Sequence, residues 1–134
     1  MARILVVEDD TSNARVASVI LSKMGLHQVT VSENADEILG RCRRGDVDLV
    51  VMDVSLGHTV HAGRRIGGVE LTRILKGDEQ TAAIPVVLFT AHAMGTDRER
   101  LLAACGVDGY IPKPIQNQAF LDEINRLLQA RVKA

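Results

Sequence analysis

The stretch "DLVVMD", residues 48–53, decides the fold, because an unbroken apolar run ends there in a carboxylate. A strand that is apolar on both sides is typical of the centre of a parallel sheet, where helices cover both faces. Similar apolar runs occur at "RILVV" (3–7) and "PVVLFT" (85–90), and shorter β-branched runs occur at "QVTV" (28–31) and "GYIPK" (109–113). These runs predict five strands.

Between the predicted strands, apolar residues recur with helical spacing, which predicts a helix in each interval. The spacing involves Ala17, Ile20, Leu21 and Met24; Ala35, Ile38, Leu39 and Cys42; Leu71, Ile74 and Leu75; Leu101, Leu102 and Cys105; and Phe120, Ile124, Leu127 and Leu128. A glycine follows each of the first four sets and predicts a helix end, at Gly25, Gly45, Gly77 and Gly106. Strands and helices thus alternate as (βα)5. This order predicts an α/β, doubly wound, five-stranded parallel sheet with the flavodoxin-like strand order 2-1-3-4-5.

The composition fits one domain over residues 1–134. Apolar residues make up 46% of the chain and aromatic residues only 2%, so Val, Leu, Ile and Ala must build the core. A net charge of −1 argues against a general nucleic-acid surface. Cys42 and Cys105 lie far apart within helical patterns, which predicts core packing and neither a disulfide nor a zinc site. With no long apolar segment and no signal-peptide pattern, we expect a cytoplasmic protein.

Acidic residues follow two of the predicted strands. Glu8, Asp9 and Asp10 come after the first, and Asp53 ends the third. Because the carboxyl ends of parallel strands meet at one edge, these carboxylates should converge and repel one another unless a divalent cation such as Mg²⁺ joins them. The alternative is that the acids only begin a helix, where negative charge is favourable. For Asp10 we favour that alternative, and for Glu8 and Asp9 we favour the metal.

A hydroxyl and an ammonium follow the next two strands, at Thr90 and Lys113. Together with a metal they would surround the oxygens of a phosphoryl group placed on Asp53. A carboxylate can attack phosphorus to form an acyl phosphate, and positive groups then stabilise the charge on the transferring group. The acidic loop after the first strand argues against a nucleotide or flavin site, which would need a glycine-rich or hydroxyl-rich loop there.

The motifs "ILVVEDD" (4–10), "LVVMD" (49–53), "PVVLFTAH" (85–92) and "DGYIPKPI" (108–115) together resemble the receiver domain of bacterial two-component response regulators. The resemblance covers essentially the whole chain and is closest to stand-alone receivers. It implies that Asp53 is the phosphoacceptor and that Glu8 and Asp9 are the acidic pair that binds Mg²⁺, with Mn²⁺ able to replace it. The backbone carbonyl of Ser55 would be a further metal ligand.

The same resemblance implies roles around the phosphoryl group. Thr90 would be the switch hydroxyl, Lys113 the phosphate-binding lysine, and Tyr110 the aromatic switch that turns inward when Thr90 moves. Alternatively, Tyr110 only caps the edge of the sheet. Ser55 and His92 occupy positions that tune how long the aspartyl phosphate lasts.

A receiver of this kind takes a phosphoryl group from the phosphohistidine of a sensor kinase or a histidine phosphotransfer protein. Residues of about 93–130 would then change and engage a protein partner, as a monomer or a phosphorylation-dependent dimer, without nucleic acid or membrane. It would not be an enzyme beyond slow self-catalysed phosphotransfer and hydrolysis. An aspartyl phosphatase would carry a second Asp at position 55, where this chain has Ser. A phosphorylation-independent protein-binding module remains the alternative.

One feature departs from the receiver pattern. Gly57 stands where the family usually has a proline, and residues 57–68 form a connection longer than the usual 2–6 residues. It carries the basic residues His58, His61, Arg64 and Arg65. They could recognise a particular kinase, or the arginines could approach the acids when metal is absent. The simpler alternative is a mobile, solvated insertion.

Overall fold

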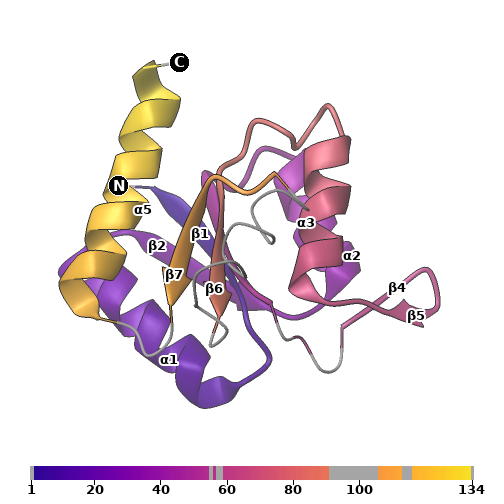
Figure 1. Ribbon diagram of the computed structural model, residues 1–134, viewed down its shortest axis with the longest axis horizontal. Coiled ribbons are helices and arrows are strands. Elements are labelled where there is room, and N and C mark those ends of the chain that lie inside the picture. The colour runs from indigo at the N-terminus through magenta and orange to yellow at the C-terminus, as the bar shows by residue number, and fades with distance from the viewer. Residues whose placement is uncertain (1, 55, 57–58, 91–105, 113–115, 134) are drawn as a thin grey trace.

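A five-stranded parallel sheet forms the centre of the protein (Figure 1). The computed structural model describes residues 2–54, 56, 59–90, 106–112 and 116–133. The strands are β1 (Arg3–Val7), β2 (Gln28–Ser32), β3 (Leu49–Asp53), β6 (Val86–Thr90) and β7 (Gly109–Pro112). Their order in the sheet is β2-β1-β3-β6-β7, with parallel pairing throughout. Counted along the chain, these five strands have the predicted order 2-1-3-4-5, and the predicted fold class is confirmed.

Helices cover both faces of this sheet (Figure 1). One face carries α1 (Thr11–Val19), its continuation η1 (Ile20–Met24), and α5 (Asn117–Lys133), whereas the other carries α2 (Ala35–Arg43) and α3 (Gly68–Gly77). No helix of the described residues is long and apolar enough to span a bilayer.

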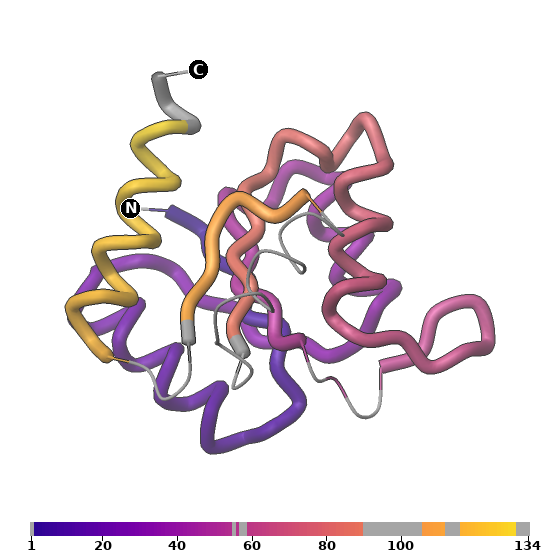
Figure 2. Tube along the Cα trace, viewed as in Figure 1, coloured from indigo at the N-terminus to yellow at the C-terminus, as the bar shows by residue number. Residues whose placement is uncertain are grey.

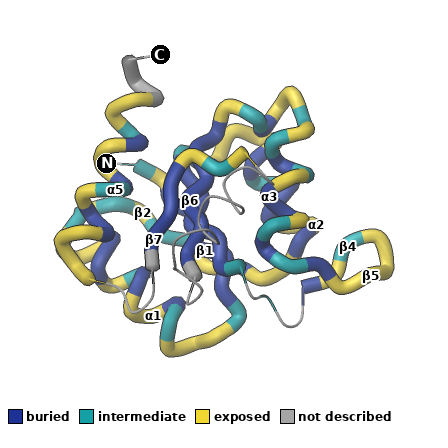
Figure 3. Tube along the Cα trace, viewed as in Figure 1, coloured by how far each residue is buried: buried dark blue, intermediate teal, exposed yellow. Residues whose placement is uncertain are grey.

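Side chains of the central strands alternate between the two faces, as the period of a strand requires. On β1, Ile4 and Val6 pack with α1 and α5, while Leu5 and Val7 pack with α2 and α3. All five residues of β3 are buried, and the dark core in Figure 3 runs along the sheet. Continuous burial on both faces explains why the central strands are apolar runs instead of alternating patterns.

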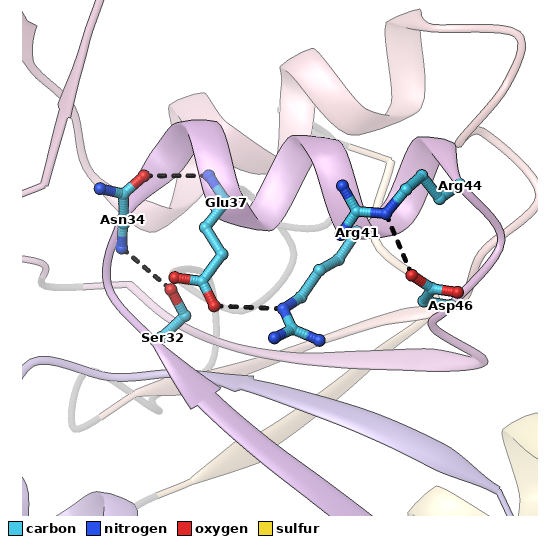
Figure 4. Close-up of polar contacts among 6 residues, drawn as sticks. All are labelled: Ser32, Asn34, Glu37, Arg41, Arg44 and Asp46. Atoms are coloured by element: carbon cyan, nitrogen blue, oxygen red, sulfur yellow. Dashed lines mark hydrogen bonds and ion pairs between the residues drawn. The ribbon is translucent and has the colours of Figure 1, made fainter.

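Polar side chains define the ends of α2, as Figure 4 shows. The Asn34 side chain accepts a hydrogen bond from the Glu37 N–H at 2.9 Å, and the Ser32 hydroxyl accepts one from the Asn34 N–H at 3.1 Å. Glu37 also pairs with Arg41, one turn further on, at 3.1 Å. Gly45 follows the helix with φ +79, which confirms its predicted role, since glycine adopts this left-handed conformation without strain.

The end of the first helix differs from the prediction. Residues Ile20–Met24 form a π-helical turn, in which the Gly25 N–H donates to the Ile20 carbonyl at 3.0 Å. The wider turn shifts the helix face, and Met24 is 51% exposed although the helical spacing placed it with the apolar residues. Gly25 ends the helix without a left-handed conformation. Glycine is favoured instead because a Cβ there would lie 2.9 Å from the Leu21 carbonyl oxygen, and equally close to Cδ2 of Leu121 on α5.

The connection between β3 and α3 contains a β-hairpin, which projects from the body of the molecule in Figures 1 and 2. Strands β4 (Val60–His61) and β5 (Arg64–Arg65) pair in antiparallel fashion around Ala62 and Gly63, whose φ values are 53 and 80. Two positive φ values match the type I′ turn, which suits the twist of a tight hairpin. Over residues 59–68 the insertion is therefore a β-hairpin, and residues 60 and 62–65 of it are exposed to solvent, as expected for a solvated insertion.

Candidate functional site

The register of the sheet brings two acidic residues to the same edge. Val7 of β1 is the partner of Met52 of β3, so the next residues, Glu8 just after β1 and Asp53 at the end of β3, lie side by side. Glu8 is 4% exposed and Asp53 is 2% exposed. Asp9 is half-buried beside them, and one carboxylate oxygen from each of the three residues lies within 4.8 Å of the others. The predicted convergence of these carboxylates is observed.

Three carboxylates this close together repel one another, and burial adds a desolvation cost to each negative charge. A hard divalent cation offsets both costs, and Mg²⁺ prefers oxygen ligands from one or two carboxylates with water in its remaining positions. The Asp10 N–H donates to Oε1 of Glu8 at 3.2 Å, which orients that side chain from the loop behind it. The donor set therefore fits Mg²⁺.

Asp10 itself has a different role from its two neighbours. Its side chain accepts a hydrogen bond from the Asn13 N–H at 3.0 Å and caps the start of α1. This geometry satisfies one of the free N–H groups of the first helical turn. The prediction that Asp10 begins the helix is confirmed, and Asp10 lies outside the group of three clustered carboxylates.

The N-terminus of α3 packs directly on the backbone that follows Asp53. The Gly68 N–H donates to the Val54 carbonyl at 3.0 Å, and the Val54 N–H donates to the Phe89 carbonyl at 3.3 Å. A Cβ on Gly68 would lie only 2.0 Å from the Asp53 carbonyl oxygen, so a larger residue cannot occupy this position without a shift of backbone. The backbone of Asp53 is thus held between β6 and α3.

Two further predicted residues lie in the neighbouring strands. Thr90 is the last residue of β6, where its register partner is Pro112 of β7. Tyr110 of β7 is 8% exposed and belongs to the core on the side of α2 and α3. Its ring is therefore packed inside the protein in this structure. The other predicted site residues, Ser55, His58, His92 and Lys113, lie outside the described residues, as does the side chain of Thr90.

The basic residues predicted near the site lie on the hairpin. His61 and Arg64 are opposite each other across β4 and β5 and line a groove against α3, and Arg65 is exposed. Within the part of the chain that the structure describes, neither arginine forms an ion pair with the clustered carboxylates. This structure gives no support to the idea that the arginines approach the acids.

Sequence reasoning missed two features here. One is Gly68, whose only signal was the pair Gly67–Gly68 directly before the apolar spacing of α3. The other is the hairpin. Its signal was Gly63, which occupies the second position of the two-residue turn between Val60–His61 and Arg64–Arg65.

The chain matches the model of the response regulator receiver domain over residues 4–125. It is 31% identical to the polar-differentiation response regulator DivK of Brucella anthropi over 125 residues, which cover 93% of this chain and 94% of that protein.

Solved structures show the same similarity. The signal receiver domain of a signal transduction histidine kinase from Syntrophus aciditrophicus is 30% identical, with a TM-score of 0.79, covering 97% of this chain and 92% of that one. The receiver domain of a sensor histidine kinase from Pseudomonas aeruginosa PAO1 is 27% identical, with a TM-score of 0.74, covering 99% and 98%. That second structure has a magnesium ion coordinated in its active site cleft.

The fold, the acidic site and these matches define a receiver domain. The chain belongs to the response regulator receiver domain family of two-component signalling, and its role is that of a signalling module.

Proposed function

We propose that Asp53 is the phosphoacceptor of this receiver and that Glu8 and Asp9 hold Mg²⁺ beside it. The observation that carries the proposal is the gathering of the three carboxylates within 4.8 Å, with Asp53 at the end of a fully buried strand. Burial keeps water away from the backbone of β3, while the position at the strand end leaves the carboxylate at the sheet edge where ligands bind in this class of fold.

In the proposed reaction, a carboxylate oxygen of Asp53 attacks the phosphorus of a phosphohistidine on a sensor kinase or a histidine phosphotransfer protein. The N–P bond breaks, imidazole leaves, and an acyl phosphate forms on Asp53. Mg²⁺, when bound, supplies positive charge to the phosphoryl oxygens. The Ser55 carbonyl would be a further metal ligand, and Lys113 would pair with the phosphoryl group. The chain itself contributes only slow self-catalysed phosphotransfer and hydrolysis, with Ser55 and His92 tuning the lifetime.

The proposed output follows from the two strands next to β3. Thr90 would move toward the phosphoryl group, and Tyr110 would turn inward with it. This movement would alter the surface formed by residues of about 93–130. The inward, buried ring of Tyr110 supports this role over that of a cap on the sheet edge. A local charge change that biases a two-state surface is a common form of signalling switch. The receiver, taken as one domain over residues 1–134, would act in the cytoplasm through a protein partner, as a monomer or a phosphorylation-dependent dimer.

Intact-protein mass spectrometry with acetyl phosphate tests this proposal. We expect a gain of one phosphoryl group that requires Mg²⁺ and that is lost in Asp53→Asn. The matched control is Asp10→Asn, which removes a nearby negative charge but keeps a good helix cap, and which should still be phosphorylated. A wild-type protein that gains no mass with Mg²⁺ would instead favour a module that binds partners without phosphorylation.

A further inference from the structure

A groove of about 470 Å³ lies between the β4–β5 hairpin and helix α3. Its volume falls within the range of about 300–1,000 Å³ that is typical of ligand pockets. The residues that line it are His61, Ala62, Arg64, Ile66, Glu70, Arg73 and Ile74. We call it the hairpin groove. It shares no residue with the acidic cluster.

Strand and helix periodicity explain which side chains form the two walls. His61 and Arg64 are cross-strand partners and therefore share a face of the hairpin, whereas the other pair, Val60 and Arg65, occupies the opposite face. Val60 and Arg65 do not line the groove, whereas Arg64 does, although both arginines are exposed. The α3 wall consists of Glu70, Arg73 and Ile74, which are spaced i, i+3 and i+4 and so lie on one stripe of the helix.

The hairpin wall is anchored at its base, so the groove is already formed. The Thr59 hydroxyl donates to the Glu33 carbonyl at 2.7 Å, and the Ile66 N–H donates to the Thr59 carbonyl at 3.0 Å. Thr59 is 2% exposed and Ile66 is 5% exposed. The Thr59–Glu33 bond and the packing of Ile66 in the core tie the two ends of the hairpin to the body of the protein, which limits the entropy that a ligand would have to remove.

The charges of the groove favour an anion. His61 and Arg64 are both basic and lie directly opposite each other, an arrangement that an anion between them would stabilise. Nδ1 of His61 is buried and forms no hydrogen bond with any described residue. The single acid, Glu70, accepts a hydrogen bond from the Gly67 N–H at 3.4 Å at the start of α3, and this bond directs its charge toward the helix terminus.

The rest of the lining is apolar, from Ala62, Ile66 and Ile74. We propose that the hairpin groove binds an acidic segment of a partner protein, with a carboxylate between His61 and Arg64 and an apolar side chain on Ile66 and Ile74. A simple anion would contact only the charged residues and would leave the apolar lining uncovered. A nucleic-acid strand is disfavoured because the chain has a net charge of −1 and the hairpin has no extended basic surface beyond this site. The proposal does not depend on phosphorylation of Asp53.

Amide NMR spectra of the full chain provide the test, with acetyl-Asp-Leu-Asp-Leu-Asp-amide as the probe. We expect saturable shifts at the residues of the groove. Replacing each Asp of the peptide by Asn should weaken binding roughly tenfold, because the charge-assisted hydrogen bonds are lost. Arg64→Ala should weaken binding to a similar degree, roughly tenfold.

The neighbouring Arg65→Ala is the matched control, since it removes the same charge from the opposite face of the hairpin. It should leave the affinity of the peptide unchanged, and an unaltered amide spectrum will show that each variant is folded. Three results would overturn the proposal: no groove shifts up to about 10 mM peptide, equal binding of the Asn peptide, or equal losses in the two arginine variants. Groove shifts that acetate alone reproduces in full would reduce the site to an anion site and would also overturn it.

Discussion

Gly68 packs so closely on Asp53 that a Cβ built on the glycine would lie 2.0 Å from the Asp53 carbonyl oxygen. Real Cβ atoms do not approach a backbone oxygen so closely. Helix α3 can therefore begin beside the acidic site only because residue 68 has no side chain. The position of α3 and the position of the Asp53 backbone are coupled through this close packing and through the hydrogen bond from the Gly68 N–H to the Val54 carbonyl.

This contact predicts a cost for Gly68→Ala. The added methyl group should push α3 away from Asp53 and destabilise the protein by about 1–3 kcal/mol, as overpacking does in other cores. Chemical denaturation measures the free energy of unfolding. Gly77→Ala, at the other end of α3, is the control because a Cβ at that position would have no neighbouring atom within 4 Å. Helix propensity should make that change neutral or stabilising by up to about 1 kcal/mol. Equal effects in the two variants would contradict the packing argument.

The clustered carboxylates predict that Mg²⁺ stabilises the folded protein. At ten times the dissociation constant, the gain should be about 1.4 kcal/mol, because a ligand that binds only the folded state stabilises it by mass action. Asp9→Asn should weaken this gain, whereas Asp10→Asn should retain it because Asp10 caps α1 and lies outside the cluster. Thermal unfolding with Mg²⁺ or with a chelator measures the effect. A gain that is the same in Asp9→Asn as in the wild type would remove Asp9 from the site.

Thr59 connects the hairpin to the turn before α2, through its hydrogen bond to the Glu33 carbonyl at 2.7 Å. Thr59→Val should cost about 0.5–1.5 kcal/mol, because it removes a part-buried hydrogen bond to the Glu33 carbonyl. It should also speed hydrogen exchange at the Ile66 N–H, which bonds to the Thr59 carbonyl. Thr59→Ser keeps the hydroxyl and should preserve slow exchange. If the valine variant exchanges as slowly as the serine variant, the hydroxyl does not anchor the hairpin.

Lys76, near the end of α3, binds residues that come just before strands β6 and β7. Its ammonium donates to the carbonyls of Ala82 at 3.1 Å and Ile84 at 2.9 Å and pairs with Asp108 at 2.7 Å. Lys76→Met should destabilise the fold by about 1.5–3 kcal/mol, since these are hydrogen bonds from a charged donor. The exposed Lys23 is the comparison, and Lys23→Met should change stability by less than about 0.5 kcal/mol. Urea denaturation of both variants decides whether the Lys76 contacts stabilise the fold.

Burial raises the pKa of the Cys42 thiol to about 11. A raised pKa keeps the thiol protonated, so at pH 8 only about 0.1% would be the reactive thiolate, and this fraction grows as the pH rises toward 11. We expect the Cys42 peptide to resist iodoacetamide in the native protein and to react once the protein is unfolded. Peptide mass mapping separates Cys42 from Cys105. Rapid native labelling of Cys42 at pH 8 would show that its side of the core opens readily.

The sequence by itself determined the order of strands and helices and the edge at which the acids meet. Apolar runs such as residues 49–52 that alternate with helical patterns are typical of the middle of a covered parallel sheet, and parallel strands bring Glu8 and Asp53 to one edge. The sequence also predicted that Asp10 begins the first helix, because a helix cap depends only on neighbours within one turn.

Only the tertiary structure decided features that depend on residues far apart in the chain. The requirement for glycine at position 68 comes from the Asp53 carbonyl, and the exposure of Met24 comes from a π-helical turn that changes the helix face. The hairpin groove combines residues of β4 and β5, such as His61 and Arg64, with residues of α3, such as Arg73. Sequence periodicity shows which face of an element is apolar, but packing distances decide which elements meet and how closely.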